Sequence, residues 1–278
     1  MEQYEKKGYL NSEFRLFHLT DQETKEVDYH YHDFDKITIF IRGKVNYMIE
    51  GRSYDLKPYD IVLVKQGDIH RLTVDNSCPY ERIIVYISPN FMNAYQTDNY
   101  DLSYFQKAAK EHSNVLRIPS FEKSSLFRSI SQLEHSFTDG GYASELYRQV
   151  MFLEFMIHLN RAVRKNRLEY IDTDNCNEKV LAILDYVGEH LCENLSIDLI
   201  ADQFYISKYY MMRLFKQETG YTLGQYISQK RLLLAKELLS TGAPGTQVCY
   251  DCGFKDYSTF SRAYKQLFGV TPSGRTCP

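Results

Sequence analysis

Two segments near the carboxyl end carry basic and hydrogen-bonding side chains at helical spacing. The first stripe consists of Ser207, Lys208, Tyr209, Met212, Arg213 and Lys216. The second stripe consists of Ser258, Thr259, Arg262 and Lys265. Cationic side chains neutralise DNA phosphates, and arginine, serine, threonine and tyrosine also donate hydrogen bonds to DNA. Both stripes therefore predict contact with double-stranded DNA, with Arg213 and Arg262 as the strongest candidates.

Each stripe is expected on the second helix of a helix-turn-helix. Residues 196–220 indicate a short helix, a break at Tyr205, and a second helix that begins after the N-cap Ser207 and ends at Gly220. The arrangement recurs over residues 246–269, which favours DNA binding over an ordinary helical hairpin. Residues 222–240 predict a connecting helix of roughly 27 Å at a rise of ~1.5 Å per residue. This length suits two recognition helices one DNA turn (~34 Å) apart.

A second group of chemically capable residues lies near the amino end. It consists of His30, His32, Tyr47 and His70, which can form hydrogen bonds to a small polar ligand. Residues 29–76 around them alternate apolar and polar side chains between glycine-containing turns, which predicts the short strands of a small barrel or jelly roll. Two alternatives stay open. Three histidines are enough to hold a metal ion, and the same residues can also be core and rim side chains without a ligand.

The motifs of the carboxyl half resemble those of the AraC/XylS family of transcriptional regulators. They are A-x-x-F-x-x-S-x-x-Y-x-x-R-L-F-K-x-x-x-G (Ala201 to Gly220), Y-x-x-x-x-R (Tyr226, Arg231), F-S-R-x-Y-K (Phe260 to Lys265) and G-x-T-P (Gly269 to Pro272). The resemblance implies two recognition helices in adjacent major grooves, with base contacts from Tyr209, Met212, Arg213, Ser258, Thr259 and Arg262. One departure is Gly245 behind Pro244, where relatives carry an apolar anchor. It predicts a shorter or looser first helix in the second unit, and a smaller contribution of that unit to affinity.

The amino half resembles a cupin barrel, which precedes the DNA-binding domain in many AraC-type regulators. The shared motifs are H-x-H (His30, His32), Gly43 and G-x-x-H (Gly67, His70). Cupin enzymes bind a metal through these histidines and a glutamate, whose place is taken here by Asp35 or Lys36. Because an ammonium group repels a divalent ion, we assign no metal ligand, no cofactor and no catalytic residue. The alternative is a metal-dependent cupin enzyme that also carries a DNA-binding domain.

Residues 121–168 contain two apolar stripes at helical spacing. They consist of Leu126, Ile130, Leu133 and Phe137, and of Leu146, Val150, Leu153, Ile157 and Val163. An antiparallel helix pair of this kind can pack on the barrel or on a copy of itself. Because family relatives dimerise in this region, the resemblance favours a homodimer, with packing on the barrel as the alternative.

Length and charge limit the remaining possibilities. The 278 residues allow two domains, and a net charge of −3 excludes a uniformly basic protein, so DNA contact must depend on the two local stripes. The sequence has neither an apolar run of ~18 residues nor a signal-peptide core at its start, so we expect a cytoplasmic protein without a membrane partner. Six scattered cysteines suit a reducing compartment. Cys249 and Cys252 form a C-x-x-C that we expect to pack in a core rather than bind zinc.

These observations predict an α+β protein with an N-terminal cupin-like β-barrel (jelly roll), a helical dimerisation segment and a C-terminal all-α tandem helix-turn-helix domain. The expected organisation is a ligand-sensing domain (1–120), the dimerisation segment (121–168), a linker (169–177) and an AraC-type DNA-binding domain (178–278). The predicted function is that of a sequence-specific transcriptional regulator, and specifically an activator. It responds to a small polar effector, for example a carbohydrate, and has RNA polymerase as a further partner. A ligand-independent DNA-binding regulator is a second alternative.

Overall fold

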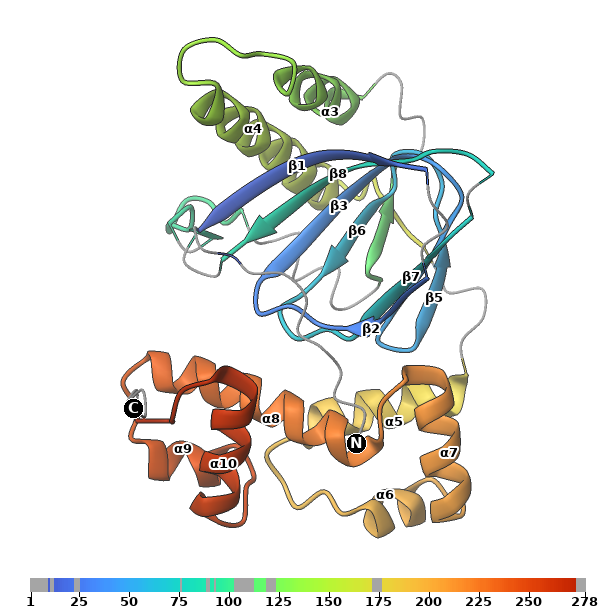
Figure 1. The fold of residues 1–278 in the computed structure, drawn as a ribbon, viewed down its shortest axis with the longest axis vertical. Coiled ribbons are helices and arrows are strands. Elements are labelled where there is room, and N and C mark those ends of the chain that lie inside the picture. Colours follow the sequence, from blue (N-terminus) through green and yellow to red (C-terminus); the bar gives the residue numbers. More distant parts are fainter. Residues whose placement is uncertain are drawn as a thin grey trace. The chain divides into compact units, whose positions relative to one another are not determined.

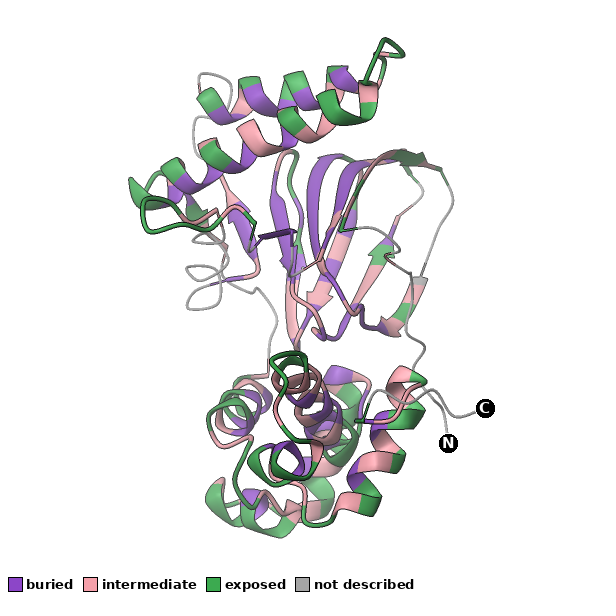
Figure 2. Ribbon diagram, turned by 90° about the vertical axis from the view of Figure 1, so that its left-hand side faces the viewer, coloured by how far each residue is buried: buried purple, intermediate pink, exposed green. Residues whose placement is uncertain are grey.

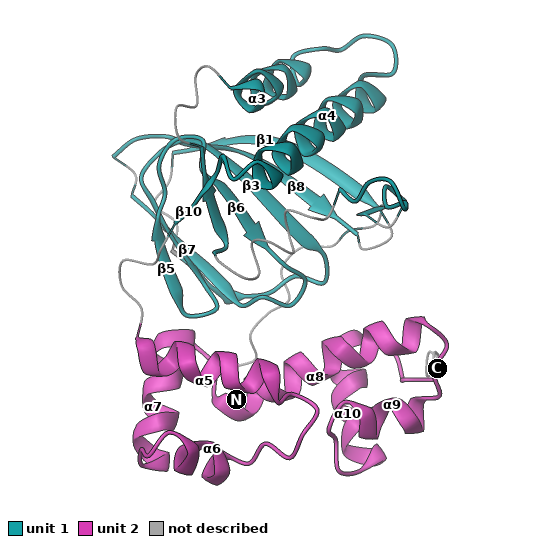
Figure 3. Ribbon diagram, turned by 180° about the vertical axis from the view of Figure 1, so that it is seen from behind, with its two compact units in different colours: residues 1–175 teal, residues 176–278 magenta. Residues whose placement is uncertain are grey.

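The structure, a computed structural model, describes residues 10, 13–22, 26–75, 77–88, 91–92, 94–102, 113–118, 124–171 and 177–273. The chain divides into two compact units, residues 1–175 and 176–278 (Figure 3). Each unit is built from its own class of elements, strands with a helix pair in the first and helices in the second. Among the described residues, no helix combines the length and the apolar character that crossing a membrane requires.

Two antiparallel sheets form the first unit. In the described residues, one sheet has the strand order β1 (Phe14–Asp21), β8 (Tyr80–Ile87), β3 (Asp35–Arg42), β6 (Ile61–Val64), β9 (Val115–Arg117) and β10 (Glu169–Tyr170). The other has the order β2 (Glu26–His30), β7 (His70–Val74), β4 (Val45–Ile49) and β5 (Arg52–Asp55). The β4–β5 hairpin turns at Glu50 and Gly51, both with positive φ, as a tight two-residue turn requires. The strands β9 and β10 pair with each other, so residues 169–170, expected in the linker, belong to the sheet.

A helix pair covers one face of the larger sheet (Figure 1). It consists of α3 (Ser125–Ser136) and α4 (Ser144–Arg164), along which buried and exposed residues alternate (Figure 2). Leu126, Ile130 and Phe152 join Ile37 and Ile39 of β3 in one apolar core. The helix pair therefore packs on the barrel of its own chain, which was the alternative to packing on a second copy.

Strand β3 is buried on both faces. Ile37 and Ile39 point to the helix pair, while Phe40 packs with Tyr47 in a second core between the two sheets. Because side chains alternate along a strand, Lys36 and Thr38 share the inner face with Phe40. Polar side chains are thus enclosed between the sheets.

Six helices form the described part of the second unit. They are α5 (Glu178–Glu189), α6 (Ile197–Gln203), α7 (Lys208–Thr219), α8 (Leu223–Ser240), α9 (Gly245–Asp251) and α10 (Tyr257–Phe268). Side-chain caps fix where five of them begin, and three belong to α6, α7 and α8: Ser196 accepts from Leu199 N–H, Ser207 from Tyr210 N–H, and Thr222 forms a capping box with Gln225. Gly220 and Gly269 end α7 and α10 with φ of 76° each, a left-handed conformation that glycine adopts without strain.

The sequence predicted a shortened first helix in the second helix-turn-helix, and this prediction is wrong. Helix α9 has seven residues, as many as α6, the corresponding helix of the first helix-turn-helix. The carbonyl of Pro244 accepts from Val248 N–H at 3.0 Å and closes the first turn, although Pro244 offers no side-chain cap. Val248 and Cys249 are fully buried, so apolar contact in the middle of the helix replaces the anchor missing at its start.

Candidate functional site

The first recognition helix, α7, presents its polar stripe to solvent. Tyr205, with φ of 53°, makes the sharp turn from α6, and Ile206 N–H donates to Ala201 O at 3.1 Å across it. Phe215 on the inner side is fully buried against Tyr226 of α8, with ring centroids 5.6 Å apart. The predicted stripe lies on the other side. Its exposed members are Ser207, Tyr209, Arg213 and Lys216, while Lys208 and Met212 are half-buried.

Lys208 differs from its neighbours in the stripe because it has an acidic partner. Its ammonium lies 2.8 Å from Asp198 Oδ1 and ties α7 to α6. This exposed ion pair contributes little to stability. The pairing reduces the positive charge that Lys208 offers to a phosphate. Arg213 and Lys216 therefore contribute most of the positive electrostatic potential along this stripe.

The second recognition helix, α10, presents a fully exposed stripe. Its members are Ser258, Thr259, Arg262 and Lys265. Asp256 caps the helix by accepting from Thr259 N–H at 2.7 Å. Tyr257 lies half-buried on the inner side, with its ring centroid 5.8 Å from that of Phe260, so the side chain belongs to the core of this unit.

Arg231 of α8 connects the segment before the first helix-turn-helix with the turn of the second. Its guanidinium donates to Leu191 O at 2.8 Å, to Glu193 O at 2.6 Å and to Gly253 O at 2.8 Å. The first two carbonyls precede α6, and the third lies in the turn between α9 and α10. A Cβ at Gly253 would approach the guanidinium and Cys192 O to 2.9 Å, so this turn needs glycine. The sequence contains this arginine in a family motif, but the pattern does not reveal its role.

The C-x-x-C motif is part of the core of the second unit. Cys249 and Cys252 are both fully buried beside Phe260 and Ala235. Burial raises the pKa of Cys252 to about 12, so its thiol stays protonated at neutral pH. A thiolate is the form that binds metals and attacks disulfides, so the buried, protonated thiol of Cys252 favours a role in core packing over metal or redox chemistry.

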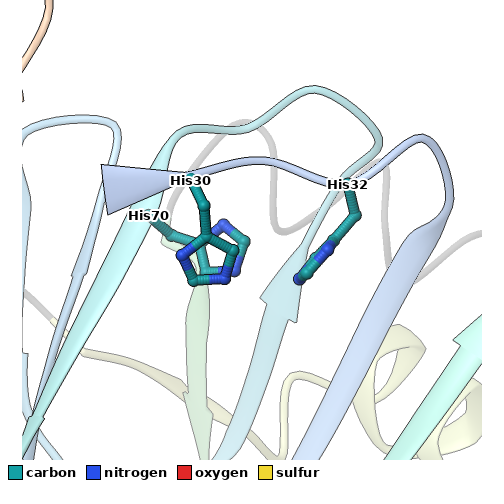
Figure 4. Close-up of side chains that lie close together, drawn as sticks. All are labelled: His30, His32 and His70. Atoms are coloured by element: carbon teal, nitrogen blue, oxygen red, sulfur yellow. The ribbon is translucent and has the colours of Figure 1, made fainter. Parts of the chain in front are cut away.

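In the first unit, the three histidines predicted as ligand-binding residues lie together (Figure 4). The His30 and His70 ring centroids are 4.2 Å apart, and His32 lies 5.0 Å from His30 and 4.8 Å from His70. Tyr47, the fourth predicted residue, stacks near His70 with centroids 6.0 Å apart. All four side chains are buried between the two sheets. They are therefore enclosed in the unit and not arranged on an open rim.

Backbone carbonyls fix the orientation of two of the imidazoles. His30 Nδ1 lies 2.8 Å from Asp28 O, and His70 Nδ1 lies 3.0 Å from Asp68 O. A carbonyl only accepts, so each Nδ1 carries a hydrogen. Burial and the nearby Lys36 ammonium hold the pKa of His70 well below its usual range, which keeps this imidazole neutral. His70 Nε2 is consequently a buried acceptor.

Lys36, which the predicted site did not include, belongs to the same cluster. Its Nζ donates to Tyr47 Oη at 2.9 Å, and the residue is 6% exposed. Asp35 instead accepts from Gln66 N–H at 2.8 Å in a neighbouring turn. The position that a carboxylate ligand holds in cupin enzymes thus corresponds here to a buried ammonium. One histidine atom from each of the three rings fits within 4.8 Å, yet this cationic neighbour does not fit a divalent ion.

Replacing Lys36 with methionine is expected to stabilise the first unit. Burial lowers the pKa of Lys36 from 10.5 to about 8, a difference that corresponds to about 3 kcal/mol against the charged form. Below pH 8 both the folded and the unfolded chain bind this proton, so the penalty is fully present; it disappears as pH rises from 8 to 10.5. We expect Lys36→Met to raise the free energy of unfolding by about 1–3 kcal/mol at pH 7. This value allows for the cost of losing the hydrogen bond to Tyr47. Urea unfolding of both proteins between pH 7 and 9.5 measures this, and the advantage should shrink with rising pH. A variant less stable at pH 7 would contradict the assignment.

Comparison with known proteins identifies both units. Residues 16–150 match the family model described as an AraC-like ligand binding domain, and residues 200–274 match that of a helix-turn-helix domain. The transcriptional activator RhaS of Escherichia coli (strain K12 / DH10B) is 25% identical over 245 residues, which cover 87% of this chain and 85% of RhaS. Solved structures with similarity include ToxT from Vibrio cholerae O395 (18% identity, TM-score 0.36, 94% of this chain and 96% of that one). Another is the C-terminal domain of the response regulator AraT from Geobacillus stearothermophilus (28% identity, TM-score 0.34, 35% and 82%). The family and the fold class predicted from the sequence are confirmed, and the chain belongs to the AraC family of transcriptional regulators.

Proposed function

We propose that this regulator is a ligand-responsive activator that binds operator DNA as a homodimer and contacts RNA polymerase. The observation that carries the proposal is the pair of capped helices α7 and α10, whose polar stripes are exposed while their apolar sides anchor them to α8. Helix α7 contacts the start of α8 through Phe215 and Tyr226, and α10 contacts its second half through Phe260 and Ala235. One rigid helix thus spaces two DNA readers for successive major grooves. The relative RhaS, named as an activator, supports activation as the outcome.

Base and phosphate contacts divide between the members of the two stripes. Arg213 and Arg262 are exposed at matching positions of the two recognition helices and can donate two hydrogen bonds to a guanine edge. The other residues proposed to contact bases are Tyr209, Met212, Ser258 and Thr259. The residues proposed to contact DNA phosphates are Ser207, Lys208, Lys216 and Lys265. A protein that acts on a promoter in this way works in the cytoplasm, where DNA and polymerase are accessible.

The sensor site is proposed to lie between the sheets of the first unit. His30, His32, Tyr47 and His70 supply hydrogen-bonding groups there, and Lys36 supplies a positive charge. An effector that binds one arrangement of the dimer better than another shifts the population of DNA-bound forms, a coupling worth typically about 1–3 kcal/mol.

The outer side of α4 is the proposed dimer interface. Leu146, Val150 and Ile157 are 59%, 47% and 39% exposed, and they recur at the spacing of one helix face. The opposite face of α4, with Phe152 and Phe155, is fully buried on the sheet. A helix that is apolar on both sides indicates a second partner. A copy of the same helix, related by two-fold symmetry, suits this stripe.

Introducing charge into this stripe is expected to separate the protomers. In Val150→Glu/Ile157→Glu, two carboxylates would be buried against their symmetry-related counterparts, so we expect at least a tenfold weaker dimer. Analytical ultracentrifugation measures the dissociation constant. Gln132→Glu, at an exposed position of α3, is the matched control and should leave the dimer unchanged. A double variant that dimerises as tightly as the parent protein would place the interface elsewhere.

DNA footprinting next to the chain's own gene tests the proposed function as a whole. We expect each protomer to protect two adjacent major-groove segments on one face of the duplex. In vitro transcription with RNA polymerase from the protected promoter should rise when the regulator is added. Absence of sequence-specific protection would contradict the proposal, and a fall in transcription would change the activator to a repressor.

A further inference from the structure

We propose that the sensor site accepts a small hydroxylated carboxylate, such as a sugar acid, with Lys36 and Tyr47 binding the carboxylate and His70 accepting from a hydroxyl. The inference rests on the proposed effector role of this cluster and specifies the chemical class of the effector. It follows from two observations, a buried positive charge and a buried acceptor, which both lie next to Tyr47.

The positive charge belongs to Lys36. Within the described part of the chain, Tyr47 is its hydrogen-bond partner and no carboxylate pairs with its ammonium. The nearby Arg82 is already neutralised, because its Nη2 lies 2.6 Å from Asp21 Oδ2. A buried ammonium without a counter-charge is costly, and a ligand carboxylate would remove that cost. The Tyr47 hydroxyl accepts from Lys36 and has the Thr38 hydroxyl as a second neighbour, and its own hydrogen can turn to a carboxylate oxygen of the ligand.

The acceptor belongs to His70. The residue is 0% exposed, and its Nε2 has no hydrogen-bond partner among the described residues. Because Nδ1 already donates to Asp68 O, the lone pair of Nε2 needs a hydrogen from an O–H or N–H group. A ligand hydroxyl supplies it.

These demands exclude two simpler occupants. A neutral sugar satisfies the histidines but leaves the Lys36 ammonium without a counter-charge. A divalent cation satisfies the histidines but is repelled by that ammonium. A molecule with a carboxylate next to several hydroxyls satisfies both the lysine and the imidazoles.

Calorimetric titration of the full-length protein with matched pairs of acids and neutral analogues tests the inference. The pairs are D-galacturonate with D-galactose, D-gluconate with D-glucitol, and lactate with lactamide. We expect the hydroxy acids to bind at least tenfold more tightly than their neutral partners. Lys36→Met should remove this preference, and Tyr47→Phe should reduce it. Lys57→Met, at an exposed position of the same unit, is the control and should keep it.

His70 is tested by the hydroxyl dependence of binding. The parent protein should bind lactate more tightly than propionate, and His70→Leu should bind both acids equally. Thermal melting of each variant without ligand verifies that it folds, and Lys36→Met is expected to melt above the parent protein.

Two results with the acid panel would overturn the inference: equal binding of acids and neutral analogues, or no binding of any acid. An acid preference that persists in Lys36→Met would also overturn it. So would tighter binding of Zn²⁺ or Mn²⁺ than of any acid. Footprinting of the same preparations separates this failure from that of the proposed function. If a neutral ligand alters operator binding, the regulator stands and the acid specificity falls. If no operator is protected, the proposed function itself fails.

Discussion

Replacement of Arg231 with methionine is expected to lower the free energy of unfolding of the second unit by about 3–5 kcal/mol. The guanidinium donates three hydrogen bonds to backbone carbonyls, two in the segment before α6 and one in the turn of the second helix-turn-helix. Hydrogen bonds from a charged donor contribute about 1.5–3 kcal/mol each, and the partial exposure of Arg231 reduces this value. Methionine keeps the apolar stem but leaves the three carbonyls without this donor. Urea unfolding followed by circular dichroism at 222 nm measures the loss.

The same substitution should also change how DNA is bound. Without the arginine, the segment before α6 and the turn at Gly253 are no longer held to one point of α8, so the spacing of α7 and α10 is less fixed. We expect footprints to shrink from two adjacent major-groove segments to one. Arg262→Met is the matched control, because this exposed arginine should leave the unfolding free energy unchanged and weaken DNA binding alone. An Arg231→Met protein with parental stability and a full footprint would refute the connecting role.

Replacement of Arg213 with alanine should weaken specific operator binding by about 1–3 kcal/mol, which corresponds to about 5- to 150-fold in affinity. Arg213 is exposed on α7, opposite the buried Phe215 side. Among the described residues, no carboxylate pairs with it as Asp198 pairs with Lys208. A guanidinium at this position can donate two hydrogen bonds to a guanine edge in the major groove. Gel-shift titration with the footprinted operator, at fixed salt concentration, measures the loss.

A matched control separates this contact from general electrostatics. Arg128 is exposed on α3 in the other unit, and Arg128→Ala removes the same charge from the protein. We expect its operator affinity to stay within twofold of the parent value. Titrations on random-sequence DNA add a second test, since loss of a base contact lowers the preference for the operator whereas loss of a phosphate contact weakens both duplexes alike. Unchanged operator affinity in Arg213→Ala would remove this residue from the interface.

The amino-acid sequence by itself determined the DNA-binding unit because its signals are local. Ser207 and Thr222 cap the helices they were expected to cap, and Gly220 takes the left-handed conformation that ends α7. These interactions join residues a few positions apart, and the periodicity of apolar residues shows which side of each helix is buried. The motif also led us to expect that His30, His32 and His70 lie together, and they do.

Tertiary structure alone decided the features that depend on distant partners. The packing of α3 and α4 on the sheet buries Ile37 and Ile39 on one side of β3 and thereby encloses Lys36 on the other. Asp35 and Lys36 are adjacent, and only the register of β3 between β6 and β8 places the ammonium, not the carboxylate, beside Tyr47. Arg231 gains its role from carbonyls 22 to 40 positions away. A local pattern cannot specify such contacts, because burial and charge compensation depend on what the rest of the chain brings to the same place.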